Sequence, residues 1–148
     1  MLAQAGNFKL VNGVNLNYVQ HGTGPHRVLL LPGALGSWRT DFPAQLGGEN
    51  SLNPEKFTVI GWDPPGYGKS RPPDRHFPTD FYNRDAEFAH NLMAELEMMP
   101  YSILGWSDGG ITAMLMAYNQ RHSNAVGKLV LWGANAFLHS GDIAIYKT

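Results

Sequence analysis

Gly105-Trp106-Ser107-Asp108-Gly109 is the stretch of this sequence that decides its fold. It follows the apolar pair Ile103-Leu104 and precedes a segment with helical periodicity. A strand that turns into a helix this abruptly forces Ser107 into a strained backbone conformation, and the flanking glycines avoid collisions between the two segments. The Ser107 hydroxyl would stand free at the end of a sheet, near the positive end of the helix. The stretch predicts a nucleophile elbow, with an ordinary glycine-rich turn and an incidental serine as the alternative.

The composition is that of an ordinary globular chain. Its 148 residues, 43% hydrophobic and 16% charged, fit one domain with a core of its own. The net charge of -1 gives no electrostatic argument for nucleic acid or an anionic membrane surface. The absence of cysteine excludes disulfides and thiolate metal sites. With no secretory signal and no apolar run of about 20 residues, we expect no membrane span and an intracellular location, cytoplasmic or mitochondrial.

Two kinds of strand are expected on either side of this stretch. Residues 8–20 alternate in polarity around Asn12-Gly13, which predicts an antiparallel hairpin with one wet face. Four further runs are almost continuously apolar, as parallel strands covered on both faces should be. These runs are residues 28–31, 57–60, 101–104 and 129–132.

Helical spacing is found in two segments between these runs. Residues 81–97 form the first predicted helix, with Asp80 as its cap. Residues 110–121 form the second, and its apolar stripe is Ile111, Met114, Leu115 and Tyr118. Strands that alternate with helices predict an α/β fold whose sheet is mostly parallel.

A second glycine-containing loop, Leu31-Pro32-Gly33-Ala34-Leu35-Gly36-Ser37, follows the run at 28–31. In proteins with a nucleophile elbow, a loop in this place supplies one backbone N–H of the oxyanion hole, and the residue after the serine supplies the other. The two donors here would be the amides of Ala34 and Asp108. The alternative is a plain glycine turn.

The loop at 63–70 ends in Gly68-Lys69-Ser70, as a phosphate-binding loop does. That motif also needs a glycine at position 63, where this chain has Asp63. Pro64 and Pro65 lack the N–H groups that would hold a phosphate. Nucleotide binding is therefore the weakest of the readings of this sequence.

Several stretches together resemble the biphenyl hydrolase-like proteins, also called valacyclovir hydrolases, from about residue 8 to about residue 146. They are Pro32-Gly33 with Gly36, residues 63–70, Arg71-Pro72-Pro73-Asp74-Arg75, residues 105–110 and Trp132-Gly133-Ala134-Asn135-Ala136. The resemblance implies an α/β-hydrolase fold and a serine esterase that acts on α-amino acid esters through an acyl-enzyme. We expect no cofactor, no metal and a small-molecule ester as the ligand. The oligomeric state stays open, with a monomer expected if the protein is full length.

The resemblance also assigns roles to individual residues. It matches the nucleophile to Ser107, the oxyanion donors to Ala34 and Asp108, and the anchor of the substrate ammonium to the Asp108 side chain. The family usually has Arg where this chain has Pro65, and a larger apolar residue at Ala34 in the human-type sequence. Neither departure touches the nucleophile.

The Asp108 carboxylate has a physical argument of its own. A negative charge beside a nucleophilic serine would repel the developing oxyanion, so it needs a reason to be there. Pairing with a substrate cation supplies that reason. The alternative is an acidic residue stabilised by the positive end of the following helix.

A serine nucleophile needs a histidine base and an orienting acid, which follow the serine in folds of this type. After Ser107 the candidates are His122, which belongs to the far end of a helix, and His139 with Asp142, which fit an exposed polar loop better. Histidines 21, 26, 76 and 90 have no metal-ligand spacing. We therefore expect residues 1–148 to be a partial α/β-hydrolase domain, truncated before the last strands and lacking the triad acid and His.

The expected parts of this domain are a hairpin at 8–20, a core at 27–136 and a tail at 137–148. The alternative to a hydrolase is a catalytically inactive fragment or a partner-binding form, in which the strand at 129–132 is an exposed edge.

Overall fold

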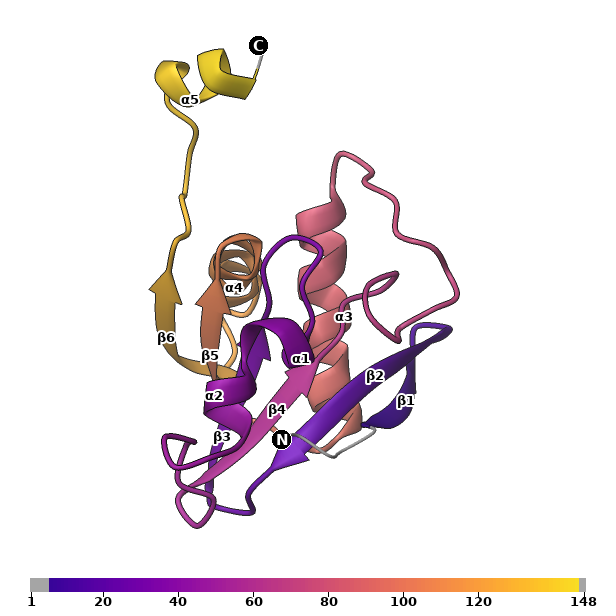
Figure 1. The fold of residues 1–148 in the computed structure, drawn as a ribbon, viewed down its shortest axis with the longest axis vertical. Helices are drawn as coiled ribbons and strands as arrows, with labels where there is room; N and C mark the ends of the chain where they lie inside the picture. Colours follow the sequence, from indigo (N-terminus) through magenta and orange to yellow (C-terminus); the bar gives the residue numbers. More distant parts are fainter. Residues whose placement is uncertain (1–5, 147–148) are drawn as a thin grey trace.

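The computed structural model describes residues 6–146, which form one six-stranded sheet flanked by helices (Figure 1). The strand order is β1-β2-β4-β3-β5-β6. The strands are β1 (Asn7–Val11), β2 (Val14–His21), β3 (His26–Leu31), β4 (Phe57–Trp62), β5 (Tyr101–Trp106) and β6 (Val126–Trp132). The helices are α1 (Trp38–Asp41), α2 (Pro43–Leu46), α3 (Phe81–Glu95), α4 (Asp108–Asn119) and α5 (Ser140–Tyr146). Residues 147–148 of the expected tail lie outside the described residues.

The N-terminal hairpin is confirmed. Strands β1 and β2 pair antiparallel up to Val11 and Val14, and both turn residues have positive φ, 47° at Asn12 and 80° at Gly13. Two positive φ values in a two-residue loop match the twist of the flanking strands. Strand β2 then joins the rest of the sheet by an antiparallel pairing with β4.

The other strands run parallel, as their apolar runs predict. Strand β3 lies between β4 and β5, and β6 pairs with the outer side of β5. The carboxyl ends of β3, β4 and β5 therefore lie at the same end of the sheet. The loops at 32–37 and 63–80 and the turn at Ser107 follow these strands at that end.

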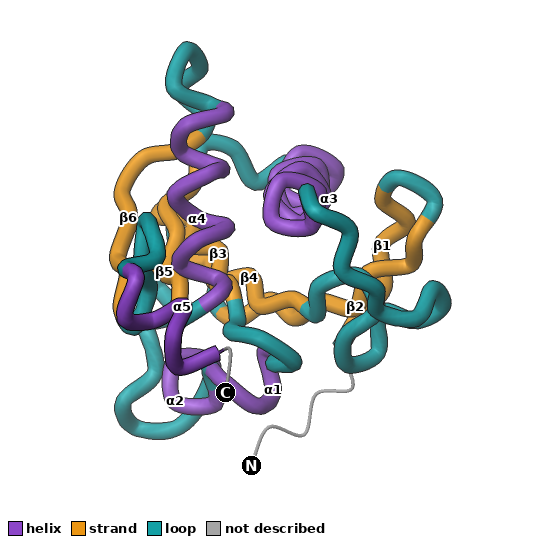
Figure 2. The backbone as a smooth tube through the Cα atoms, turned by 90° about the horizontal axis from the view of Figure 1, so that it is seen from above, coloured by secondary structure: helices purple, strands orange, loops and turns teal. Residues whose placement is uncertain are grey.

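The sheet has helices on both faces (Figure 2). Helices α3 and α4 cover one face, where Leu92 and Met93 pack in a cluster with Leu29, Ile60 and Ile103. The short helices α1 and α2, which the sequence did not predict, lie on the other face. Trp38 of α1, Leu46 of α2 and Phe42 between the two helices form a second cluster with apolar side chains of β2, β3 and β4.

Helix α3 ends at Glu95, two residues before the predicted end. Glu97 has a φ of 57°, and the Met98 N–H donates to the Met93 carbonyl at 2.8 Å, so a left-handed residue closes the helix. Asp80 occupies the N-cap position, but its side chain makes no capping hydrogen bond. The predicted position of the cap is confirmed, but the expected side-chain hydrogen bond is not formed.

Helix α4 buries a different face from the predicted stripe. Tyr118 is 61% exposed, and Ile111, Met114 and Leu115 are only partly buried. The face against the sheet is made of small residues with one methionine, namely Gly109, Gly110, Thr112, Ala113 and Met116. The prediction failed because this helix approaches the strands too closely for large side chains.

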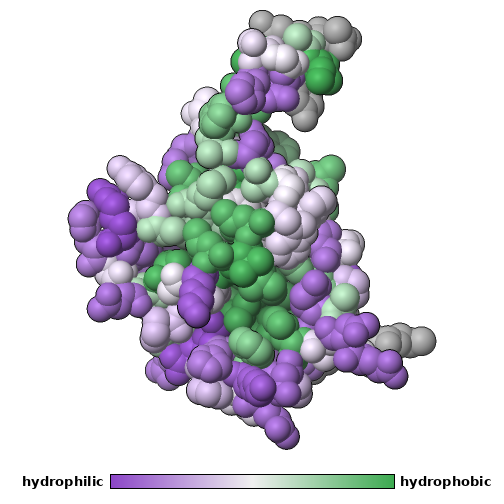
Figure 3. Space-filling model, turned by 90° about the vertical axis from the view of Figure 1, so that its left-hand side faces the viewer, coloured by the Kyte–Doolittle hydropathy of each residue, from purple (hydrophilic) through white to green (hydrophobic). Residues whose placement is uncertain are grey.

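Strand β6 lies at the edge of the sheet and is only half covered. Leu129 and Leu131 pack against the core, whereas Val130 is 55% and Trp132 37% exposed. The prediction of burial on both faces thus does not hold for this strand among the described residues. Figure 3 shows the apolar area on this side of the molecule, and α5 stands away from the sheet in Figure 1. Within residues 6–146 no helix has the length and hydropathy needed to cross a bilayer.

Candidate active site

Ser107 sits at the junction of β5 and α4 with φ 53° and ψ −121°. Such a backbone conformation is rare for a residue with a Cβ and is maintained only when its surroundings hold it. The Ser107 N–H donates to the Trp132 carbonyl at 3.0 Å, and its carbonyl accepts from Gly110 at 2.9 Å and Ile111 at 3.3 Å. The serine is therefore fixed on both sides of a sharp turn, outside the regular helix.

Gly105 and Gly109 are required by the close approach of strand and helix. A Cβ built on Gly105 would lie 2.8 Å from the Gly110 Cα, and one on Gly109 would lie 2.0 Å from the Leu31 carbonyl oxygen. Real Cβ atoms are not found at such distances from backbone. Both glycines therefore lie where the strand and the helix come too close for a side chain.

The loop at 32–37 lies directly beside the serine. A Cβ built on Gly33 would be 3.2 Å from the Ser107 Cβ. The Gly33 carbonyl accepts a hydrogen bond from Gly36 at 3.0 Å. Because a trans peptide points its C=O and N–H in opposite directions, this bond also sets the direction of the Ala34 N–H.

The amides of Ala34 and Asp108 donate no hydrogen bond to any of residues 6–146. Asp108 is the first residue of α4, where an N–H has no partner inside the helix. Backbone donors that are left open normally find an acceptor in water or in a ligand. The amides of Ala34 and Asp108 thus have no acceptor within the described residues, and their role as oxyanion donors stays a prediction.

Asp41, which no sequence pattern marked as part of the site, holds the shape of this loop. Its Oδ2 accepts the Gly33 N–H at 2.8 Å, and its Oδ1 accepts the Thr40 hydroxyl at 2.7 Å. Gly36 lies so close that a Cβ there would be 2.3 Å from Oδ2. The spacing of Ser37 and Thr40, which form a capping box on α1, was the available signal.

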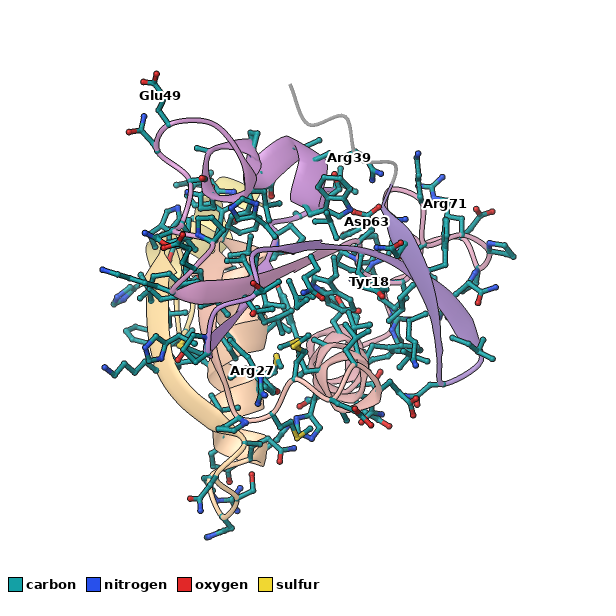
Figure 4. The ribbon with its side chains drawn as sticks, turned by 90° about the horizontal axis from the view of Figure 1, so that it is seen from below. Tyr18, Arg27, Arg39, Glu49, Asp63 and Arg71 are labelled. Atoms are coloured by element: carbon teal, nitrogen blue, oxygen red, sulfur yellow. The ribbon has the colours of Figure 1, made fainter. Side chains whose placement is uncertain are left out.

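Asp63 is a buried residue that connects the loop at 63–80 to the start of α1, directly after the loop at 32–37 (Figure 4). Its side chain is fully buried and accepts the Trp38 N–H at 3.3 Å and the Lys69 N–H at 2.9 Å, with the Arg39 Nη1 3.6 Å away. Burial raises the pKa of Asp63, and the hydrogen bonds and Arg39 oppose that shift. The Lys69 amide, which a phosphate-binding loop would offer to a nucleotide, binds this carboxylate instead.

Arg75 anchors the loop between β4 and α3. It makes a two-point ion pair with Asp85 at 2.8 and 2.6 Å, and both side chains are more than nine-tenths buried. Its guanidinium lies 4.3 Å from the ring centroid of Tyr67 and 5.1 Å from that of Phe77. The ion pair therefore holds the loop against the start of α3.

The variant Arg75→Met is expected to lower the free energy of unfolding by about 3 kcal/mol, because it leaves the buried Asp85 with only the longer 3.7 Å contact to Arg84. Urea unfolding followed by circular dichroism measures the loss. The matched control is Lys9→Met, which breaks the exposed 3.8 Å pair with Glu95 and should cost less than about 1 kcal/mol. Equal losses in the two variants would contradict a structural role for the buried pair.

A small cavity of about 10 Å³, room for about one water molecule, lies next to the elbow. Pro32, Tyr82, Asp108 and Thr112 are among its lining residues. The Tyr82 hydroxyl donates to the Asp108 Oδ1 at 3.0 Å. Burial and the nearby Asp108 charge raise the pKa of Tyr82 to about 12, so the hydroxyl keeps its proton at neutral pH. No sequence pattern marked Tyr82 as part of the site.

The histidines that follow the serine are not brought to it. His122 lies beyond the C-terminal end of α4, and Ser107 is at the opposite end of that helix. The exposed His139 donates its backbone N–H to Asp142 at 3.0 Å, and its ring makes an edge-to-face contact with that of Phe137. Across residues 6–146, no histidine ring is hydrogen-bonded to Ser107, and no cluster of three or more His, Asp or Glu could hold a metal.

The alpha/beta hydrolase fold family model matches residues 26–144. The mouse and human proteins named serine hydrolase BPHL are 53% and 54% identical to this chain over 137 residues, 93% of the chain and 45% of their own length. The esterase EaEST from Exiguobacterium antarcticum superimposes with a TM-score of 0.73 at 31% identity, over 92% of this chain and 49% of its own.

The resemblance to the biphenyl hydrolase-like proteins is thereby confirmed. The chain spans a little under half the length of the curated relatives that it matches. With a matching family model over most of its length, a matching sheet and a serine held at the turn from β5 to α4, this chain belongs to the alpha/beta hydrolase fold family.

Proposed function

We propose that Ser107 is the nucleophile, and that the amides of Ala34 and Asp108 form the oxyanion hole, of a serine ester hydrolase whose substrates are α-amino acid esters. The observation that carries this proposal is the strained Ser107 beside two backbone amides without internal acceptors. Residues 26–144 match a hydrolase family, and relatives named serine hydrolase share more than half of the aligned residues.

The proposed reaction proceeds through an acyl-enzyme. The Ser107 Oγ attacks the ester carbonyl carbon as a base removes its proton, and the negative oxygen forms between the amides of Ala34 and Asp108. The C–O bond to the alcohol then breaks, the alcohol leaves with that proton, and water hydrolyses the acyl-serine to the free acid. We place the histidine that carries the proton, and its acid partner, outside residues 6–146.

The oxyanion hole supplies the largest stabilisation available within the described residues. Each preorganised N–H is worth about 3 kcal/mol of barrier in a well-studied case. The N-terminus of α4 adds positive potential at the same place, because the open Asp108 amide lies at its end. Asp41 and the Gly36-to-Gly33 hydrogen bond keep the Ala34 donor in position before substrate binds.

The Asp108 side chain is the proposed anchor for the substrate ammonium. It is partly buried, lines the small cavity together with Gly109 and Tyr82, and has no ion-pair partner in the described part of the chain. An α-amino group lies one carbon from the ester carbonyl, so a carboxylate on the residue next to the nucleophile is suitably placed for it. Without a bound cation its negative charge would repel the developing oxyanion, and a substrate ammonium would neutralise that charge.

Asp108→Ala is expected to remove the preference for amino acid esters while leaving the backbone donor in place. In the complete protein that the gene encodes, kcat/KM for valine p-nitrophenyl ester should fall about 100-fold, the effect of a lost charge-assisted hydrogen bond and ion pair. Hydrolysis of the isovalerate ester, which lacks only the amino group, should be unchanged or faster. The control is Asp80→Ala, because the Asp80 side chain makes no capping hydrogen bond. Equal losses on both esters would refute the anchor role.

A second candidate function rests on β6. Its exposed Val130 and Trp132 at an unpaired sheet edge suit a form that binds another polypeptide by strand addition. Sedimentation velocity of this chain across a range of concentrations tests the idea in its simplest form. Self-association that Val130→Lys abolishes would support it, and a monomer at every concentration would count against it.

A further inference from the structure

The first turn of α3 contacts the first residue of α4 through one polar bond. Tyr82 reaches from α3 to Asp108, and its hydroxyl donates to Oδ1 at 3.0 Å. The two residues are 26 positions apart in the sequence, so the bond depends on the packing of the two helices. It joins the chain segment that follows the loop at 63–80 to the elbow itself.

The hydrogen-bonding capacity of this pair is only partly used. A tyrosine hydroxyl has one donor and can also accept, and an ionised carboxylate has two accepting oxygens. Tyr82 uses its donor on Oδ1 and keeps its proton, since its pKa lies at about 12. The Asp108 Oδ2 receives no hydrogen bond from residues 6–146. One carboxylate oxygen and the acceptor side of one hydroxyl are left for a ligand with several N–H donors.

The charges around the cavity favour a cation. Arg75 also lines it, but both of its terminal nitrogens bind Asp85. The Thr112 hydroxyl donates to the Asp108 carbonyl at 3.2 Å and so does not satisfy the carboxylate. The charge without an opposite partner in the described part of the cavity is therefore that of Asp108. A cavity of about 10 Å³ is the size of one water molecule and also suits one ammonium head.

We propose that Tyr82 is a specificity-determining residue that builds a site for a primary ammonium together with Asp108. Its hydroxyl fixes one carboxylate oxygen, which turns the other toward the ligand, and it offers a second acceptor for an ammonium N–H. Tyr82 makes no contact with the reacting atoms and acts on which esters bind. This inference rests on the proposed ammonium role of Asp108 and adds to it the residue that orients the carboxylate.

The variant Tyr82→Phe keeps the ring and removes only the hydroxyl. In the complete protein, kcat/KM for valine p-nitrophenyl ester should fall about tenfold, mainly through KM, as expected for one lost hydrogen bond to a charged group. The isovalerate ester should change less than about twofold, because it has no ammonium. The matched control is Tyr118→Phe, an exposed tyrosine of α4, which should leave both esters unaffected.

Coupling between the two residues is the sharper test. In an Asp108→Ala background, Tyr82→Phe should cost much less than its tenfold effect in the wild-type protein, because the carboxylate that it orients is gone. Additive losses would overturn the proposal. Equal losses on both esters in the single variant would also overturn it, since they would mean that the hydroxyl only supports the fold.

Binding of L-valinamide, followed by NMR, separates this inference from the proposed reaction. If the wild-type protein cleaves neither ester but binds valinamide, with binding weakened about tenfold in Tyr82→Phe, the ammonium site stands and the esterase proposal fails. If it cleaves esters but Tyr82→Phe leaves the preference for the valine ester intact, the esterase stands and the role of Tyr82 is wrong. Failure of the wild-type protein to bind valinamide or to prefer the valine ester rejects the site.

Discussion

Replacing Gly109 with alanine is expected to unfold the domain. The new Cβ would lie 2.0 Å from the carbonyl oxygen of Leu31 and 2.5 Å from that of Pro32, at the end of the central strand β3. Neither backbone atom can move without shifting the strand or the helix. We expect a loss of more than about 5 kcal/mol, of the order of the whole stability of a domain this size.

Urea unfolding and the yield of folded protein measure this loss. The control is Gly141→Ala in α5, where an added Cβ would meet nothing within 4 Å. That change should be neutral or stabilise the helix by up to about 1 kcal/mol. A free energy of unfolding for Gly109→Ala within about 1 kcal/mol of the wild-type value would show that α4 and β3 are not in close contact at this position.

Substitutions at Ser107 are expected to separate activity from stability. In the complete protein, Ser107→Ala should lower kcat by about 10⁶, because the nucleophile is lost while the oxyanion hole remains. Ser107→Gly should be as inactive as Ser107→Ala. Its free energy of unfolding should be about 1 kcal/mol higher than that of Ser107→Ala, because glycine adopts φ 53° and ψ −121° without strain.

Steady-state kinetics and urea midpoints on the same two variants test this pair of expectations. Retention of a hundredth or more of the activity in Ser107→Ala would show that another group carries the reaction. A Ser107→Gly variant no more stable than Ser107→Ala would show that the turn stores no strain.

The sequence predicted the parts of this fold that short-range patterns determine. Asn12-Gly13 gave the hairpin, the apolar runs gave the parallel strands, and the glycines around Ser107 gave the turn between β5 and α4. In each case the signal lies within a few residues and reflects backbone conformation or burial. Such signals survive without knowledge of the tertiary contacts.

The features that were missed depend on contacts between distant segments. The buried face of α4 consists of small residues because the strands are close, and no periodicity in the helix reveals that distance. Tyr82 meets Asp108 only because α3 packs beside α4. Asp41 is closer in sequence to Gly33, and the capping box of Ser37 and Thr40 marked its short helix, but no pattern tied its carboxylate to the Gly33 amide. The sequence thus predicted the backbone turn that carries Ser107. It did not predict the side chains, such as Asp41 and Tyr82, that contact the surrounding segments.

Covalent labelling of the complete protein with a fluorophosphonate tests the central claim most directly. The tryptic peptide 85–121 contains two serines, Ser102 and Ser107, so fragment masses must place the adduct. A single adduct on Ser107, absent from Ser107→Ala, is the predicted result. An adduct on another serine, or none in a protein that cleaves esters, would contradict the assignment of Ser107 as the nucleophile.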